Sequence, residues 1–164
     1  MKFKRQFILF VGIISIAIIL AAGVGFASDD VELKEYDFDS YFKMNVPKNV
    51  NFETSDDGGN TSGNITLLKT YTDNNTKINV VYAQTKDNGK ADLVSYYEDM
   101  AKNDKGVNIT VVNNTPVIHF NDENTIGEIE YHDMAIAGDD TQYILIQCDD
   151  ADLMNAMAGS IKLK

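Results

Sequence analysis

Residues 142–161 have the sequence Gln-Tyr-Ile-Leu-Ile-Gln-Cys-Asp-Asp-Ala-Asp-Leu-Met-Asn-Ala-Met-Ala-Gly-Ser-Ile, which indicates a strand followed by a helix. The apolar run at 142–148 favours a strand buried in a sheet. Asp149 or Asp150 can cap the following helix. The apolar stripe of that helix holds Leu153, Met154, Met157 and Ala158, and Ile161 continues it. A buried strand that leads into an amphipathic helix predicts a sheet covered by that helix.

The rest of the chain after residue 40 alternates between strand and turn patterns on both sides of one more helix. Strands are expected at 41–46, 65–71, 77–84, 107–112, 116–120 and 125–132. Residues 91–104 instead show helical spacing of apolar side chains, and Gly106 can end that helix. Tight turns between successive strands predict antiparallel pairing. The expected fold class is α+β, a mostly antiparallel sheet of about six to seven strands covered by two helices.

The N-terminal region predicts an export leader. Three basic residues within the first five precede an uncharged run at 6–28, which is long enough to span a bilayer as a helix. This charge distribution favours an N-inside, C-outside orientation. Small residues at 25 and 27 fit signal cleavage, while the length of the run fits a retained anchor. The expected organisation is a signal peptide or transmembrane anchor at 1–28, an acidic connector at 29–40 and an extracytoplasmic domain at 41–164.

The charge of the part after residue 28 argues against several classes of partner. This part holds all 25 acidic residues and 11 of the 14 basic ones, so its formal charge is −14. All its basic residues are lysines. The charge disfavours nucleic acid and anionic lipid headgroups, and the missing arginines disfavour phosphate-bearing substrates. The expected partner is an unidentified extracytoplasmic protein or ligand, with the membrane added if the leader is uncleaved.

Cysteine usage predicts a fold without disulfides. Cys148 is the only cysteine, so it has no partner within the chain. It lies in the apolar run at 142–148, where we expect it to fill the core.

Three features of the order of elements are shared with a known fold. They are Phe42-x-Met44-x-Val46-Pro47 near the start, a mid-chain helix around 96–100, and a final helix that runs into 160–162. Over about residues 36–164 this pattern resembles the PsbP/Mog1-type α/β/α domains. The resemblance implies a central antiparallel sheet flanked by helices, and an accessory or partner-binding role in place of catalysis. It is one of pattern alone, and it transfers no functional residue.

The two histidines raise the question of a metal site. If the hairpin turns at Asp122-Glu123, His119 shares one face with Glu130 and His132. His119 and His132 are then roughly 20 Å apart, at about 3.3 Å per residue, so they cannot share an ion. Glu130 and His132 remain a candidate pair, and two ligands make a poor site. We therefore expect a solvated strand face, with no metal and no cofactor.

Asparagines in N-x-[ST] sequons are candidate glycosylation sites in an exported chain. All lie in or beside expected turns and loops, where a glycan is tolerated. An Asn-rich composition explains their number equally well. The candidates are Asn60, Asn64, Asn74, Asn108 and Asn113.

Catalytic signatures are missing from the sequence. It has no G-x-S-x-G elbow, H-E-x-x-H pair, phosphate loop or dinucleotide fingerprint. The leading hypothesis is an exported, non-catalytic binding or assembly module. Two alternatives stay open. One is an exported carboxylate-dependent hydrolase, because two acids need no local signature. The other is a structural component of the cell envelope.

Overall fold

The computed structural model describes residues 31–56, 64–103 and 106–164. The elements are β1 (Leu33–Phe38), β2 (Phe42–Pro47), β3 (Glu53–Asp56), β4 (Ile65–Asp73), β5 (Ile78–Thr85), α2 (Gly89–Asn103), β6 (Val107–Val112), β7 (Thr115–Ile126), β8 (Ile129–Gly138), β9 (Gln142–Cys148), α3 (Ala151–Ala158) and β10 (Lys162–Leu163).

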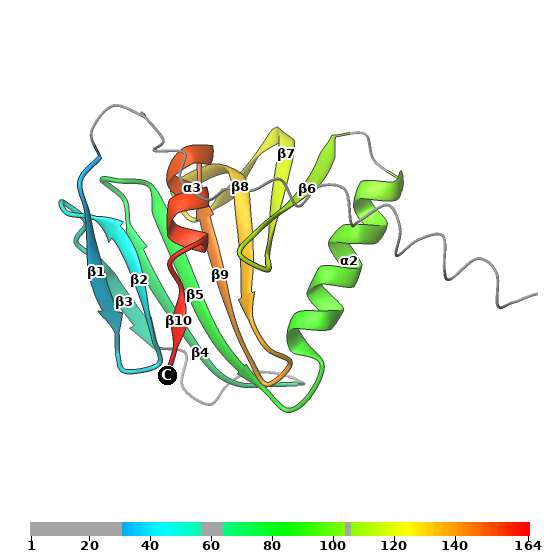
Figure 1. Cartoon of the computed structure of the whole chain (residues 1–164), viewed down its shortest axis with the longest axis horizontal. Helices are drawn as coiled ribbons and strands as arrows, with labels where there is room; N and C mark the ends of the chain where they lie inside the picture. Colours follow the sequence, from blue (N-terminus) through cyan, green and yellow to red (C-terminus); the bar gives the residue numbers. More distant parts are fainter. Residues whose placement is uncertain (1–30, 57–63, 104–105) are drawn as a thin grey trace, which may run out of the picture.

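A seven-stranded antiparallel sheet forms the centre of the described chain. Its strand order is β3-β4-β5-β9-β8-β7-β6, and a second sheet has the order β1-β2-β10 (Figure 1). The predicted α+β class, with its mostly antiparallel sheet and two helices, is confirmed at this level. The predicted leader lies outside the described residues. Within those residues, no helix combines the length and the apolar character needed to cross a membrane.

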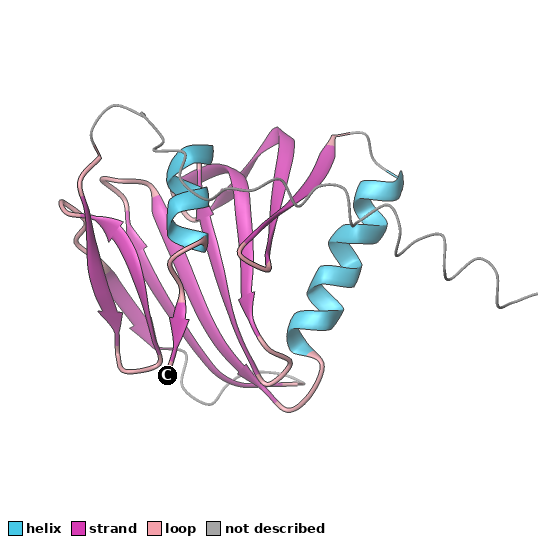
Figure 2. Ribbon diagram, viewed as in Figure 1, coloured by secondary structure: helices cyan, strands magenta, loops and turns pink. Residues whose placement is uncertain are grey.

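The larger core lies between one face of the large sheet and a cover formed by the small sheet and α3 (Figure 2). Strand β2 contributes Phe42, Met44 and Val46 at alternate positions, and none has exposed surface. From α3, Met154 and Met157 are also fully buried, as the predicted stripe requires. Burial of each such side chain contributes about 1.5–3 kcal/mol relative to exposure.

The smaller core lies on the opposite face of the large sheet. Ile118, Met134 and Ile136 are its buried residues. Their neighbours along the strands point into the larger core, because side chains alternate between the faces of a sheet. Helix α2 covers this core with Leu93, Val94 and Tyr97. No residue of α2 is fully buried, so this helix keeps an exposed outer side.

Two N-terminal strands differ from expectation. The segment at 29–40, expected as a connector, contains β1, whose Phe38 is fully buried and stacks on Phe42 at 4.4 Å between ring centroids. Charged residues alternate with its apolar ones and obscure the strand pattern. Strand β3 was not predicted because its four residues, Glu-Thr-Ser-Asp, are all exposed and polar.

Candidate ligand-binding pocket

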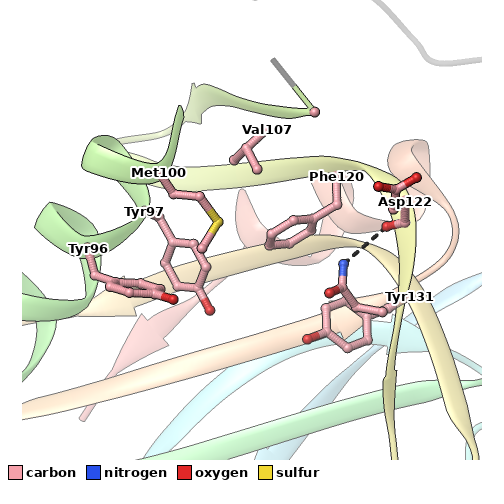
Figure 3. A pocket seen from close by; sticks show the side chains of 9 residues that line it. Tyr96, Tyr97, Met100, Val107, Phe120, Asp122 and Tyr131 are labelled. Carbon is pink, nitrogen blue, oxygen red and sulfur yellow. Dashed lines mark hydrogen bonds between the residues drawn. The ribbon is translucent and has the colours of Figure 1, made fainter. Parts of the chain in front are cut away.

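A pocket of about 300 Å³ opens between α2 and strands β6, β7 and β8 (Figure 3). This volume lies at the lower end of the range typical of small-molecule sites. Aromatic and apolar side chains dominate the lining. The lining residues are Tyr96, Tyr97, Met100, Gly106, Val107, Phe120, Asp122, Asn124 and Tyr131.

A bulge in β7 shapes this pocket. His119 pairs with Asp133 across β7 and β8, whereas Asn124 pairs with Tyr131. Residues 120–123 therefore face a single residue of β8. Such bulges bend a strand and redirect its side chains. The redirected segment supplies two of the pocket's lining residues, while β6 stays paired with the start of the bulge.

Four aromatic rings follow one another along the pocket. Tyr96 meets Tyr97 at 5.1 Å and 80°, and Tyr97 meets Phe120 at 5.9 Å and 77°. Phe120 then meets Tyr131 at 6.2 Å and 82°. Each edge-to-face contact contributes about 0.5–1.5 kcal/mol beyond burial. Because successive rings are nearly perpendicular, they enclose a corner and do not form a flat platform.

Two phenol groups of the pocket, those of Tyr97 and Tyr131, have hydroxyls that could bond to a ligand. Within the described residues, the hydroxyls of Tyr97 and Tyr131 make no hydrogen bond, and both point into the space between α2 and β8 (Figure 3). Burial raises the pKa of Tyr97, and the neighbouring phenols of Tyr131 and Tyr96 raise it further. The Tyr97 hydroxyl therefore stays neutral at physiological pH and is available to a ligand.

One carboxylate stands at the pocket edge. Asp122 lines the pocket and is exposed to solvent. Asn124 donates from Nδ2 to the backbone oxygen of Asp122 at 3.1 Å (Figure 3). Among the residues that the structure describes, none forms a hydrogen bond or ion pair with the Asp122 carboxylate. No lysine, arginine or histidine belongs to the described lining. The described lining therefore carries a single negative charge beside aromatic rings.

The two candidate metal ligands, Glu130 and His132, each pair with a different charged residue. Glu130 forms an ion pair with Lys77 at 3.4 Å, and His132 bonds through Nδ1 to Asp149. No group of three or more His, Cys, Asp or Glu side chains within the described ranges is arranged to hold a metal ion.

The expected hairpin turn at Asp122-Glu123 is wrong. Strand β7 continues to Ile126 and the chain turns at Gly127, which has a φ of +61°. The expected register placed His119 opposite Ile126, whereas the bulge brings it opposite Asp133.

This corrected register creates a chain of polar side chains on three strands. His119 Nδ1 lies 2.5 Å from Asp133 Oδ1, and His119 Nε2 lies 2.8 Å from Thr110 Oγ1. Asp133 is buried and Thr110 is exposed. The order of carboxylate, imidazole and hydroxyl is the one that activates a hydroxyl nucleophile. The aromatic pocket does not border these residues.

The sequons differ in their surroundings. Asn74 and Asn108 are exposed, and their side chains make no hydrogen bond within the described residues. Asn113 donates to the Gly159 backbone oxygen at 2.9 Å, and half-buried Asn64 donates to that of Asp87. Asn60 lies outside the described residues.

The sequence indicated parts of the pocket without assembling them. The helix expected at 91–104 contains Tyr96, Tyr97 and Met100, and the strands expected at 116–120 and 125–132 contain Phe120 and Tyr131. Nothing in the sequence indicated that the helix and the hairpin enclose one pocket. Comparisons of the chain with family models, curated proteins and solved structures found no match.

Proposed function

We propose that this chain is an exported, non-catalytic binding or assembly module whose ligand occupies the aromatic pocket. The observation that supports the proposal most directly is the pocket's set of unpaired phenols beside perpendicular rings. Polar groups placed among aromatic and apolar side chains are the usual means by which a site orients a ligand. Tyr97 comes from α2 and Tyr131 from β8, and side chains on regular elements are held in more precise positions than side chains on loops.

The export part of the proposal depends on the sequence. The basic start and the uncharged run at 6–28 favour passage through, or retention in, a membrane. The acidic remainder suits a chain that stays apart from nucleic acid and anionic lipid. The PsbP/Mog1-like resemblance stays a prediction in agreement with a partner-binding role.

The intact mass of the chain from its own host tests export. A mass beginning near Ser28 in the medium, or a full-length mass in the membrane fraction, would support it. Full-length chain in the cytosolic fraction alone would contradict it. Additional mass that glycosidase treatment removes would support use of the sequons.

Site-specific photocrosslinking tests binding at the pocket. Tyr96 is 59% exposed at the pocket edge, and Val111 is 65% exposed on β6 outside the lining. Full-length chain with azidophenylalanine at either position would be irradiated in the native host. We expect an adduct from position 96, none from position 111, and loss of the adduct when Phe120→Leu is added. Equal adducts from both positions, or none from position 96, would contradict the proposal.

The polar chain of Thr110, His119 and Asp133 favours a hydrolase as the second candidate function, with a hydroxyl nucleophile in place of paired carboxylates. In such a mechanism His119 Nε2 removes the Thr110 proton as Oγ1 attacks an ester carbonyl, and gives it to the alcohol as the carbonyl–alcohol bond breaks. Water, deprotonated by the same imidazole, then hydrolyses the acyl-Thr110 ester and releases the acid. Release of p-nitrophenol from short acyl esters, abolished by His119→Ala and by Thr110→Val, would support it. No release by the unmodified chain would reject it.

A further inference from the structure

We infer that the aromatic pocket binds an alkylammonium group, the positively charged head of a choline-like molecule or of an amine side chain. This inference rests on the proposed function, because it names the chemical class of ligand for the same pocket. It depends on three features of the pocket: the ring geometry, the lone carboxylate and the orientation of the phenols.

The ring geometry suits a compact cation. The Tyr97 and Phe120 rings meet at 77°, and the Phe120 and Tyr131 rings at 82°. A group in the corner between perpendicular rings contacts more than one aromatic face. A cation is attracted to a ring face within about 6 Å of the ring centroid. The centroids of neighbouring rings are 5.9 and 6.2 Å apart, so a cation in the corner between two rings can lie within that distance of both centroids. Met100 and Val107 add apolar surface that suits N-methyl or methylene groups.

The charge of the pocket lining also favours an alkylammonium ligand. Asp122 is the only charged side chain in the described lining, and no side chain of the described ranges pairs with its carboxylate. The nearby Lys102 ammonium is held by Asp99 at 2.9 Å, and Lys102 is not part of the lining. The formal charge of −11 on the whole chain favours approach of cations and disfavours anions.

The phenols of Tyr97 and Tyr131 point their oxygens into the same space (Figure 3). No described residue donates to these oxygens, and an ammonium group presents N–H or polarised N–CH₃ groups to such oxygens. A sugar would instead use a flat ring platform and several hydrogen-bond donors. This pocket has perpendicular rings, and the amide of Asn124 already donates to the backbone. A bare Ca²⁺ ion would need about six to eight oxygen ligands, and the described lining offers one carboxylate.

Titration of the full-length chain in a maltoside detergent tests the inference. Choline would be compared with 3,3-dimethylbutan-1-ol, a neutral molecule of nearly the same shape. We expect choline to shift the NMR signals of the Met100 methyl group and of the Tyr97 and Tyr131 rings, with saturation. The neutral molecule should bind at least tenfold more weakly, because it lacks the cation–π attraction. n-Butylamine, tested in parallel, distinguishes a lysine-like primary amine from a quaternary small molecule as the source of the head group.

Matched variants locate the binding. Asp122→Asn should weaken choline binding several-fold, while Asp152→Asn, at an exposed acid on α3, should leave it unchanged. Tyr131→Leu should reduce binding more than Asp122→Asn does, because it removes one wall. An unchanged NMR spectrum away from the pocket confirms that each variant is folded.

The outcomes separate this inference from the proposed function. Equal binding of choline and its neutral analogue, or binding unaffected by Asp122→Asn and Tyr131→Leu, would overturn the ammonium class. A position-96 crosslink to a neutral or anionic host ligand would overturn it as well, while supporting a binding module. If no probe binds and position 96 also gives no crosslink, both the class and the proposed function fail.

Discussion

At the scale of single residues, a ladder of polar side chains bridges three central strands. Thr72 Oγ1 donates to Asn79 Oδ1 at 2.9 Å, and Asn79 Nδ2 donates to Gln147 Oε1 at 2.7 Å. Asn79 is 2% exposed and Gln147 is 5% exposed. Buried amides with satisfied partners specify a single register, because a slip would leave them unpaired.

We predict that Gln147→Leu lowers the free energy of unfolding by about 1–3 kcal/mol, because it leaves the Asn79 amide buried without an acceptor. The double variant with Asn79→Leu should recover part of this loss, since both buried polar groups are then replaced by apolar ones. Urea unfolding followed by circular dichroism measures both values. Additive losses would show that the two amides are energetically independent.

A second residue-scale feature makes stability depend on pH. The hydrogen bond from His132 to Asp149 raises the pKa of His132 above its ordinary value of 6.5. A raised folded-state pKa means that the pair stabilises the fold fully below pH 6.5. This stabilisation is lost as the pH rises through the folded-state pKa.

We therefore predict that His132→Gln lowers the urea midpoint more at about pH 5.5 than at about pH 8.5. The Asp149→Asn variant should show the same trend, because it removes the charge that His132 contacts. Added salt should reduce the difference, since the pair is exposed. An identical loss at both pH values would contradict a contribution from the charged pair.

At the scale of elements, two glycines end strands under different constraints. Gly138 has a φ of +100°, and a Cβ there would lie 2.3 Å from the Gln142 oxygen and 2.8 Å from the Tyr143 Cα. Gly127 has a φ of +61°, and a Cβ there would meet nothing within 4 Å. Gly138 thus allows β8 and β9 to approach closely, whereas Gly127 supplies only a left-handed turn.

We predict that Gly138→Ala destabilises the protein by more than about 1 kcal/mol, because both the backbone conformation and the space are incompatible with a side chain. Gly127→Asn should cost far less, since asparagine tolerates the left-handed region. Thermal unfolding of the two variants would measure the difference. Similar losses in both would indicate that the close approach at Gly138 relaxes at little cost.

The start of α3 offers a second prediction at this scale. Asp150 is the N-cap, and its side chain accepts a hydrogen bond from the Leu153 amide at 2.9 Å. Asp150→Ala should cost about 1 kcal/mol, whereas Asp150→Asn should cost only a few tenths, because asparagine caps equally well. Urea midpoints would measure this difference. An effect of Asp150→Asn as large as that of Asp150→Ala would assign the loss to charge and not to capping.

The elements also show what the sequence could and could not predict. Both helices and most strands follow from local periodicity. The sequence also limited the N-cap of α3 to Asp149 or Asp150. Strand β1 was not predicted because apolar and charged residues are mixed along it, and its strand conformation depends on antiparallel pairing with β2. The turn after β7 was misplaced because residues 121–124 are polar and include turn-forming Asn and Asp. Pairing with β8 resumes at Asn124, so the strand continues beyond this bulge. The pocket depends on that bulge, so local patterns could not assemble it.

At the scale of the whole molecule, the two ends of the described chain meet in the small sheet. Strand β10 pairs with β2, and β1 pairs with the other edge of β2. Lys162 contacts Glu35 at 3.0 Å, and Lys164 contacts Asp37 at 2.6 Å. The small sheet covers the larger core, so opening it exposes the interior of the protein. The rate at which a reagent reaches a buried side chain of the larger core therefore reports whether the small sheet opens alone or together with the rest of the fold.

Cys148 is a built-in probe of that access. It is 1% exposed in the larger core, as the sequence predicted, and burial raises the pKa of its thiol to about 12. Both effects suppress reaction with disulfide reagents, because the attacking species is an exposed thiolate. We predict that native protein labels with Ellman's reagent only as fast as it unfolds globally, so that the labelling rate follows the urea-dependent unfolding rate.

A Val111→Cys variant in a Cys148→Ala background is the matched control. Position 111 is 65% exposed on β6, so its thiol should react at once in the native state. Slow labelling of Cys148 that tracks unfolding would show that the small sheet, α3 and the large sheet open together. Labelling of Cys148 far faster than unfolding would show that the small sheet or α3 opens alone. Reagents would then reach the larger core through local opening of the small sheet or α3, without global unfolding.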